Sequence, residues 1–336
     1  MVVFGGPGDV DAADAGGANS LTALGSRSDD VAAREFVMRK WLWLAAVAAC
    51  APEVDDPEVE VKDVRVADPE PEAGVVDMLS PEQTIEPFSD VMLCLYLEPT
   101  TEDLVADELR AFQGDYGHHI VVLRSVEQKE PGTWEDCSEA ADMPNFKPMI
   151  LPDTPLPAGY AVKIPAGTQP VMQIHYVNPT DTPLLVRDVA RLYTVPEDTV
   201  TTWAATFATN HLGFEVAPGG DTKVEFDCTI DQELEVLLLG GHMHEWGTRF
   251  EVQVGASVDA LSSEYVVSPW VPDYRDAPPV SLFFEAPRVL PAGSIIRTTC
   301  EYASTEAEGI AFPHEMCSTF GYVGGTAEPW VCEATW

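Results

Sequence analysis

The chain has 336 residues, enough for two domains of ordinary size, each with its own core. Aspartate and glutamate total 56 against 18 lysines and arginines, which gives a formal net charge of −38. This charge makes nucleic acid and an anionic membrane surface poor partners, so we expect contact with a membrane only through a dedicated anchor.

The N-terminal part has the pattern of an export signal. Residues 1–37 are rich in Ala, Gly and Asp and carry no readable fold. Residues 38–50 combine a basic start with a short apolar core that ends at Cys50, which is typical of a secretory signal too short to span a bilayer. Val47-Ala48-Ala49-Cys50 resembles a bacterial lipobox, which implies cleavage before Cys50 and lipidation of its sulfur. We therefore expect translation to start at Met38; the alternative is an accidental apolar run.

Residues 51–89 are rich in Pro, Glu, Asp and Val, with Lys62 and Arg65 as the only bases. Such a segment buries too little apolar surface to offset its ordering entropy, and like charges keep it extended. It is predicted to be an acidic tether between the lipid anchor and the folded part.

The remaining sequence predicts an all-β fold. Short apolar or alternating runs recur between Pro, Gly and Asp, and the one weak helix candidate is 101–112. We predict two tandem antiparallel β-sandwich domains, over 90–195 and 196–336, with the boundary at a proline and charged residues near Pro196. The predicted strands are 91–96, 120–124, 171–177, 184–193, 200–206, 222–226, 233–239, 250–254, 280–284, 295–299 and 320–323.

The histidines fall into motifs. His242 and His244 follow an apolar run, and side chains two apart on a strand project from the same face, so both imidazoles could meet one metal ion. Two such histidines are at least as often a solvated or hydrogen-bonded pair.

His118 and His119 are adjacent, and neighbours on a regular strand face opposite ways. Both could reach one ion with His175 only if the backbone is irregular, and Gly114-Asp115-Tyr116-Gly117 makes a turn or bulge plausible there. Without a family pattern, His175 would be interpreted as a satisfied core histidine.

Near the C-terminus lies Glu315-Met316-Cys317. The order His-His, a hydrophobic strand ending in His-Tyr, His-x-His and then Glu-Met-Cys resembles the copper type II, ascorbate-dependent monooxygenases, the group of dopamine β-monooxygenase and peptidylglycine α-hydroxylating monooxygenase. The resemblance covers roughly Asp90 to Trp336 and implies jelly-roll-like sandwiches.

The resemblance implies two copper ions, one held by His118, His119 and His175 and one by His242, His244 and Met316. A thioether is a soft ligand that suits Cu(I), although a methionine taken alone more often packs a core. In the family, O2 reacts and the C–H bond is hydroxylated at the copper held by methionine, while the all-histidine copper stores and passes an electron from ascorbate. His242, His244 and Met316 would thus be the catalytic set.

Cysteine usage agrees with export. If Cys50 carries lipid, six cysteines remain, and six in an exported protein suggest three disulfides, for which the sequence alone allows 15 pairings. The family pattern implies Cys94–Cys137, Cys228–Cys332 and Cys300–Cys317.

The expected function is a monomeric, exported, lipid-anchored monooxygenase that hydroxylates a small molecule with O2 and ascorbate or another one-electron donor. Peptide-amidating members have an arginine close before His-x-His, where this chain has Leu239-Gly240-Gly241, so the resemblance does not extend to a peptidylglycine substrate.

Trp270, Tyr274 and Tyr322 are candidate pocket residues, although aromatic residues in such strands more often fill a core. His211 and His314 lie outside the pattern, and we interpret both as structural; the alternative for His314, which precedes Glu315 and Met316, is to support a metal ligand through a hydrogen bond. The alternatives are a copper-binding or copper-delivery lipoprotein without catalysis, and an adhesive β-sandwich with chance histidines.

Overall fold

The computed structural model describes residues 60–137, 145–275, 277–312 and 314–334. The predicted signal, Cys50 and residues 51–59 lie outside these ranges. The described residues are all-β, as predicted, with two short 3-10 helices. Among them, no helix has the length and apolar character needed to cross a membrane.

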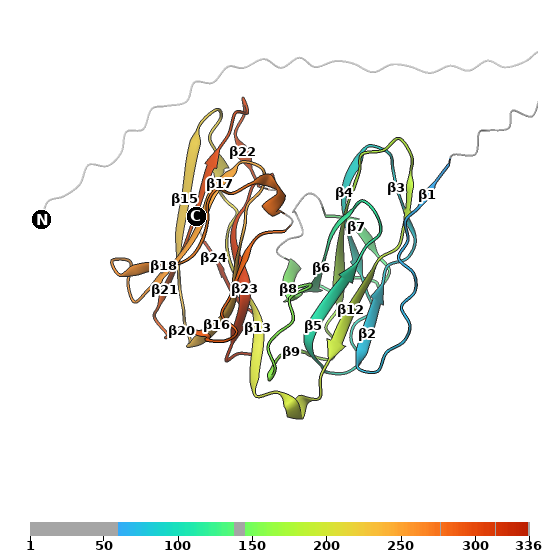
Figure 1. Cartoon of the computed structure of the whole chain (residues 1–336), viewed down its shortest axis with the longest axis horizontal. Coiled ribbons are helices and arrows are strands. Elements are labelled where there is room, and N and C mark those ends of the chain that lie inside the picture. The colour runs from blue at the N-terminus through green and yellow to red at the C-terminus, as the bar shows by residue number, and fades with distance from the viewer. Residues whose placement is uncertain (1–59, 138–144, 276, 313, 335–336) are drawn as a thin grey trace, which may run out of the picture. The chain divides into compact units, whose positions relative to one another are not determined.

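The first half of the described chain forms one β-sandwich (Figure 1). One layer is a five-stranded sheet in the order β7-β4-β10-β6-β8, and the facing layer contains β9, β5, β12 and β2. A small third sheet joins β1, β11 and β3. The bounds are β1 (Lys62–Asp63), β2 (Val75–Leu79), β3 (Gln83–Ile85), β4 (Ser89–Tyr96), β5 (Leu104–Phe112), β6 (Gly117–Ser125), β7 (Trp134–Asp136), β8 (Phe146–Ile150), β9 (Tyr160–Ile164), β10 (Pro170–Asn178), β11 (Leu184–Val186) and β12 (Val189–Thr194).

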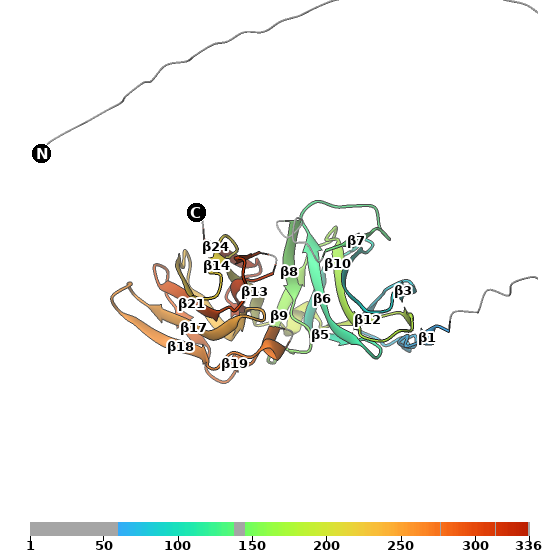
Figure 2. The same ribbon diagram turned by 90° about the horizontal axis from the view of Figure 1, so that it is seen from above.

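The second half forms another sandwich. Its outer sheet has the order β15-β21-β17-β18, with β17, β18 and β21 side by side in Figure 2. The facing layer contains β19, β16, β23 and β13. The bounds are η2 (Glu197–Thr199), β13 (Thr202–His211), β14 (Glu215–Val216), β15 (Asp221–Thr229), β16 (Leu234–His242), β17 (Gly247–Gly255), β18 (Leu261–Val267), η3 (Pro272–Arg275), β19 (Val280–Leu282), β20 (Arg288–Leu290), β21 (Ile295–Ala303), β22 (Ile310–Ala311), β23 (Cys317–Gly324) and β24 (Trp330–Glu333).

The two sandwiches share a sheet. β9 pairs with β13 in parallel, so their facing layers join into one ten-stranded sheet. Leu237, Leu238 and Tyr322 from the second half pack in the same hydrophobic cluster as the core of the first. The Tyr322 hydroxyl accepts a hydrogen bond from the backbone N–H of Leu151 at 2.6 Å. The halves are therefore tied through both backbone and core.

The prediction of a tether over 51–89 is wrong for its described part. β1, β2 and β3 lie in this segment, and Val64, Met78 and Ile85 are buried. The physical reason is that arginines distant in sequence offset its acidic charge. Arg187 pairs with Asp68 at 2.8 Å, and Arg191 pairs with Asp77 at 2.6 Å.

Two further predictions of secondary structure need correction. In the helix candidate at 101–112, residues 104–112 form the strand β5, which is paired on one side with β12 and on the other with β9. The single strand predicted over 184–193 is divided into β11 and β12 at Arg187 and Asp188. There the N–H of Asp188 donates to the Ser80 hydroxyl at 2.9 Å rather than to a neighbouring strand.

The structure contains the three disulfides Cys94–Cys137, Cys228–Cys332 and Cys300–Cys317, which are the pairings that the resemblance implied. They account for all six cysteines of the described residues. Three disulfides indicate an oxidising environment, extracellular or periplasmic.

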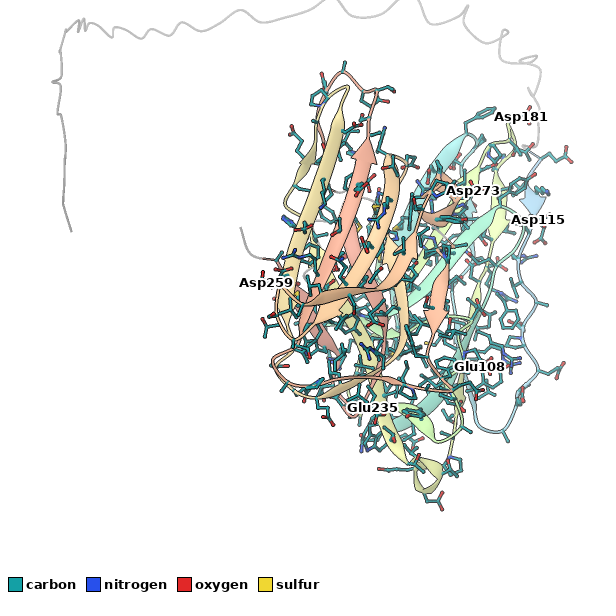
Figure 3. The ribbon with its side chains drawn as sticks, turned by 60° about the vertical axis from the view of Figure 1, so that its left-hand side comes forward. Glu108, Asp115, Asp181, Glu235, Asp259 and Asp273 are labelled. Carbon is teal, nitrogen blue, oxygen red and sulfur yellow. A yellow bond between two sulfur atoms is a disulfide. The ribbon has the colours of Figure 1, made fainter. Side chains whose placement is uncertain are left out.

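The acidic composition appears at the surface. Asp115, Asp181 and Asp259 are exposed in turns and loops, and Asp273 is exposed in the short helix η3 (Figure 3). Exposed carboxylates of this kind repel one another and anionic partners.

Candidate metal centres

Three histidines converge in the first sandwich, as predicted. His118 and His119 come from β6 and His175 from the adjacent β10, and one ring nitrogen of each lies within 4.8 Å of the others. The ring centroid of His175 is 4.9 Å from that of His118 and 5.0 Å from that of His119. The cluster is a possible metal site with nitrogen donors only.

A β-bulge brings the adjacent histidines together. His119 pairs with His175, but the next pair joins Gly117 to Tyr176, so His118 is the additional residue on β6. A Cβ on Gly117 would lie 2.5 Å from Cβ of Gln113, so this position requires glycine. The irregular backbone that the sequence analysis required is present.

The carboxylate of Asp90 orients His175. Asp90 Oδ1 lies 2.6 Å from His175 Nε2, and a carboxylate can accept a hydrogen bond from an N–H at that position. The neutral ring then carries its proton on Nε2 and its lone pair on Nδ1. Burial lowers the pKa of His175, and the hydrogen bond to Asp90 partly opposes this. A neutral imidazole is the form that binds a metal.

His242 and His244 form a second candidate centre. His242 ends β16, and its Nε2 lies 3.1 Å from Nε2 of His244. Two imidazole–metal bonds of about 2.0 to 2.1 Å at roughly 100° place their nitrogens about 3.1 Å apart. Without an ion, the same distance is a hydrogen bond between the rings.

The tautomer of His244 is fixed by the backbone. His244 Nδ1 lies 3.0 Å from the carbonyl oxygen of His314, and a carbonyl can only accept. The proton of the neutral ring is therefore on Nδ1, and the lone pair is on Nε2, toward His242. His314 acts through its backbone, whereas its ring is exposed.

Met316 immediately precedes β23, the strand paired with β16. Ser318 on β23 is opposite His242, so the chain reaches His242 two residues after Met316. The Tyr302 hydroxyl donates to the Met316 carbonyl at 2.7 Å, and the Cys300–Cys317 disulfide holds the next residue. The half-buried Met316 is thus on a fixed segment.

Glu315 links this segment to His244. Its fully buried carboxylate accepts hydrogen bonds from the backbone N–H groups of His244, Met316 and Trp246. Burial raises the pKa of Glu315 to about 7, and the three N–H groups act in the opposite direction.

The remaining candidates have structural contacts. His211 Nδ1 accepts the N–H of Gly213 at 3.2 Å, and its ring packs against Phe226. Trp270 is buried and donates from its indole to the His244 carbonyl at 3.2 Å. Tyr274 packs against Trp270, and Tyr322 is buried in the core of the first half. Trp270 and Tyr322 are therefore core residues, Tyr274 is partly buried against the core, and Trp270 also contacts His244.

Two features of these centres were not predicted from the sequence: the contact of Asp90 with His175 and the buried hydrogen bonds of Glu315. Asp90 is 85 residues from His175, and no local spacing indicates the contact. Glu315 was visible only as part of the Glu-Met-Cys motif.

The residues present fit copper. The first cluster offers three imidazoles, and the second offers two. The segment of Met316 reaches the second cluster through the pairing of Ser318 with His242, and a thioether ligand from this segment would favour Cu(I). Zinc sites more often use thiolates, but the cysteines of the described residues are in disulfides.

No protein-family model matches the chain, and no curated protein matches it. Among solved structures, the crystal structure of the STIV MCP is 10% identical and covers 74% of this chain and 96% of its own, with a TM-score of 0.29. The CUB1-EGF-CUB2 region of human MASP-1/3 is 9% identical and covers 74% and 99%, with a TM-score of 0.19. Infectious bursal disease virus Gx strain is 10% identical and covers 74% and 72%, with a TM-score of 0.19. Such low TM-scores carry no argument about function.

Proposed function

We propose that this protein is a two-copper monooxygenase that hydroxylates a C–H bond of a small molecule. One oxygen atom of O2 enters the C–H bond and the other leaves as water, with two protons and two electrons supplied by ascorbate or another one-electron donor. The observation that carries the proposal is the presence of two histidine groups, a trio in the first sandwich and a pair in the second. Strand pairing places His242 opposite Ser318, two residues after Met316.

His118, His119 and His175 would hold the first copper, and His242, His244 and Met316 the second. Copper at these positions would supply one-electron transfer at the first set and O2 chemistry at the second. The different ligands favour different oxidation states, because a thioether stabilises Cu(I) more than a third imidazole does.

The residues of the chain prepare both sets. Asp90 keeps the proton of His175 on Nε2, and the His314 carbonyl keeps the proton of His244 on Nδ1. Each ring therefore has an unprotonated nitrogen for an ion. His118 is exposed, so an external electron donor can approach the first set.

The boundary between the domains at 195 and 196, the signal at 38–50, lipidation at Cys50 and the monomeric state belong to the same proposal, whereas the first domain begins before residue 90, because β2 pairs with β12. The interval between β12, which ends at Thr194, and β13, which begins at Thr202, is consistent with the domain limit. Lipidation would anchor the protein to a bacterial membrane.

The test is ascorbate-dependent O2 uptake by protein loaded with two copper ions per chain, over a panel of small substrates. Met316→Ile should abolish uptake coupled to hydroxylation, because isoleucine offers no donor, whereas His118→Ala should stop transfer of the second electron. Met78→Ile, in the core of the first sandwich, is the matched control for loss of a methionine.

A non-catalytic copper-binding or copper-delivery lipoprotein is the second candidate, favoured by the same ligands. This function predicts two bound copper ions but no O2 uptake that depends on substrate. Met316→Ile would then change only the copper affinity. Absence of stoichiometric copper would exclude both functions.

A further inference from the structure

The Glu315 carboxylate is fully buried and has three backbone donors. Its Oε1 accepts the N–H of His244 at 2.6 Å and that of Met316 at 2.9 Å, while Oε2 accepts the N–H of Trp246 at 3.3 Å. Burial of a carboxylate is costly unless its oxygens are hydrogen-bonded, so these contacts are what allows the group to be there.

The three contacts connect separate parts of the chain. Trp246 and His244 lie in the turn between β16 and β17, and they are 69 and 71 residues from Glu315. Met316 is the neighbour of Glu315. A single side chain therefore joins the turn that carries His244 to the segment that carries Met316.

The carbonyl groups of the same two segments are held as well. The Trp270 indole donates to the His244 carbonyl at 3.2 Å, and the Tyr302 hydroxyl donates to the Met316 carbonyl at 2.7 Å. Glu315 accepts the N–H groups of His244 and Met316, and Trp270 and Tyr302 donate to their carbonyl groups. Buried side chains therefore hold both backbone polar groups of His244 and of Met316.

We infer that Glu315 is a positioning residue, which sets the placement of His244 relative to Met316 before any ion binds. The inference rests on the proposed function for the role of these two residues as ligands. Its physical basis is preorganisation: ligands held in place lose little conformational freedom when an ion binds.

The contacts also define which replacement is informative. In Glu315→Gln, one oxygen can keep the N–H groups of His244 and Met316, but the amide NH2 in place of Oε2 would face the N–H of Trp246, donor against donor. The side chain keeps its size, so the change is confined to the hydrogen bonds. Glu245→Gln is the matched control, because Glu245 lies in the same turn but is exposed and pairs with Arg275.

The experiment measures copper affinity at the His242 and His244 centre by competitive titration, and the sulfur contribution to X-ray absorption of the Cu(I) form. Glu315→Gln should weaken copper at this centre by roughly 10- to 100-fold and reduce the sulfur contribution. Affinity at the His118, His119 and His175 centre should stay unchanged, and Glu245→Gln should behave as the wild type. Unchanged affinity and sulfur contribution in Glu315→Gln would overturn the inference.

A second measurement needs no variant and covers the case in which Glu315→Gln does not fold. Hydrogen exchange at the N–H groups of His244, Trp246 and Met316 should be slow in metal-free wild-type protein and change little when copper is added. Rapid exchange that becomes slow only with copper would show that the ion, not Glu315, orders the segments. If the wild-type Cu(I) form lacks a sulfur contribution, Met316 is not a copper ligand and the proposed function is wrong on this point. The hydrogen exchange of the metal-free protein still tests whether Glu315 holds the two segments in place.

Discussion

The Nε2 atom of His175 lies 2.6 Å from Oδ1 of Asp90, which joins a buried ring to a mostly exposed carboxylate. Metal-binding histidines commonly donate their second N–H to a carboxylate, which fixes both the tautomer and the ring orientation. Asp90→Ala removes the acceptor without altering any of the three ring donors. Copper affinity at the first centre should fall roughly 10- to 100-fold, measured by competition with a chelator.

Asp181→Ala, in an exposed loop, is the control for loss of one surface carboxylate. The His242 and His244 centre serves as an internal reference in the same titration. Equal affinities in Asp90→Ala and the wild type would mean that the contact does not orient His175 for metal binding.

Asp188 predicts a pH dependence of stability. It is buried and accepts a hydrogen bond from the Tyr176 hydroxyl at 2.6 Å. Burial raises its pKa from 3.8 to about 6, with the side chains of Tyr176 and Gln113 acting in the opposite direction. The folded state keeps the proton of Asp188 to higher pH than the unfolded state does. Protonated Asp188 therefore stabilises the folded state fully below about pH 4, and this contribution is lost as the pH rises through 6.

Asp188→Asn cannot ionise and should remove this dependence. At about 1.4 kcal/mol per pKa unit, the free energy of unfolding of the variant should gain on the order of 2 to 3 kcal/mol relative to the wild type between pH 4 and pH 7. Urea denaturation across this range measures the difference. The control is Asp221→Asn, at the exposed start of β15, whose free energy of unfolding should depend on pH in the same way as that of the wild type. The same pH dependence in Asp188→Asn would contradict the prediction.

Gly241 precedes His242 and has no space for a side chain. A Cβ there would lie 2.4 Å from the ring of Phe250, which is fully buried. Gly241→Ala should lower the free energy of unfolding by roughly 1 to 3 kcal/mol through overpacking. In Gly220→Ala the nearest atom would be 3.7 Å away, so thermal unfolding should be close to that of the wild type. Equal stability of the two variants would mean that the Phe250 ring moves aside without cost.

The Cys300–Cys317 disulfide should affect both stability and copper. It closes a loop with a sequence separation of 17, and the chain-entropy model assigns about 3 kcal/mol to a loop of this length. Replacing both cysteines with serine should therefore lower stability and loosen the backbone next to Met316, which weakens copper at the second centre.

The comparison is the double serine variant at Cys228 and Cys332. That loop has a separation of 104 and is worth about 4.7 kcal/mol in the same model, but neither of its cysteines is a sequence neighbour of a proposed ligand. The variant at Cys228 and Cys332 should lose more free energy of unfolding, whereas the variant at Cys300 and Cys317 should lose more copper affinity at the second centre. The same rank in both measurements would mean that copper affinity only follows global stability.

Much of the fold could be predicted from local pattern. Alternating apolar residues in runs such as 171–177 and 222–226 indicate strands because successive side chains face opposite ways. The bulge at His118 was also accessible, since adjacent histidines beside Gly114 and Gly117 cannot share a face on a regular strand. The three disulfide pairings came from the order of motifs in a family rather than from spacing.

Contacts between distant residues decided the rest. The segment 60–89 is acidic, and its sequence favours an extended chain, but Arg187 and Arg191 neutralise it only when β11 and β12 lie alongside. Asp90 and Glu315 likewise gain their partners through strand pairing and turns that bring residues 69 to 85 positions apart into contact. The sequence by itself determined which residues alternate and which can bind a metal. Only the tertiary structure decided which of them meet, because burial and pairing depend on the whole chain at once.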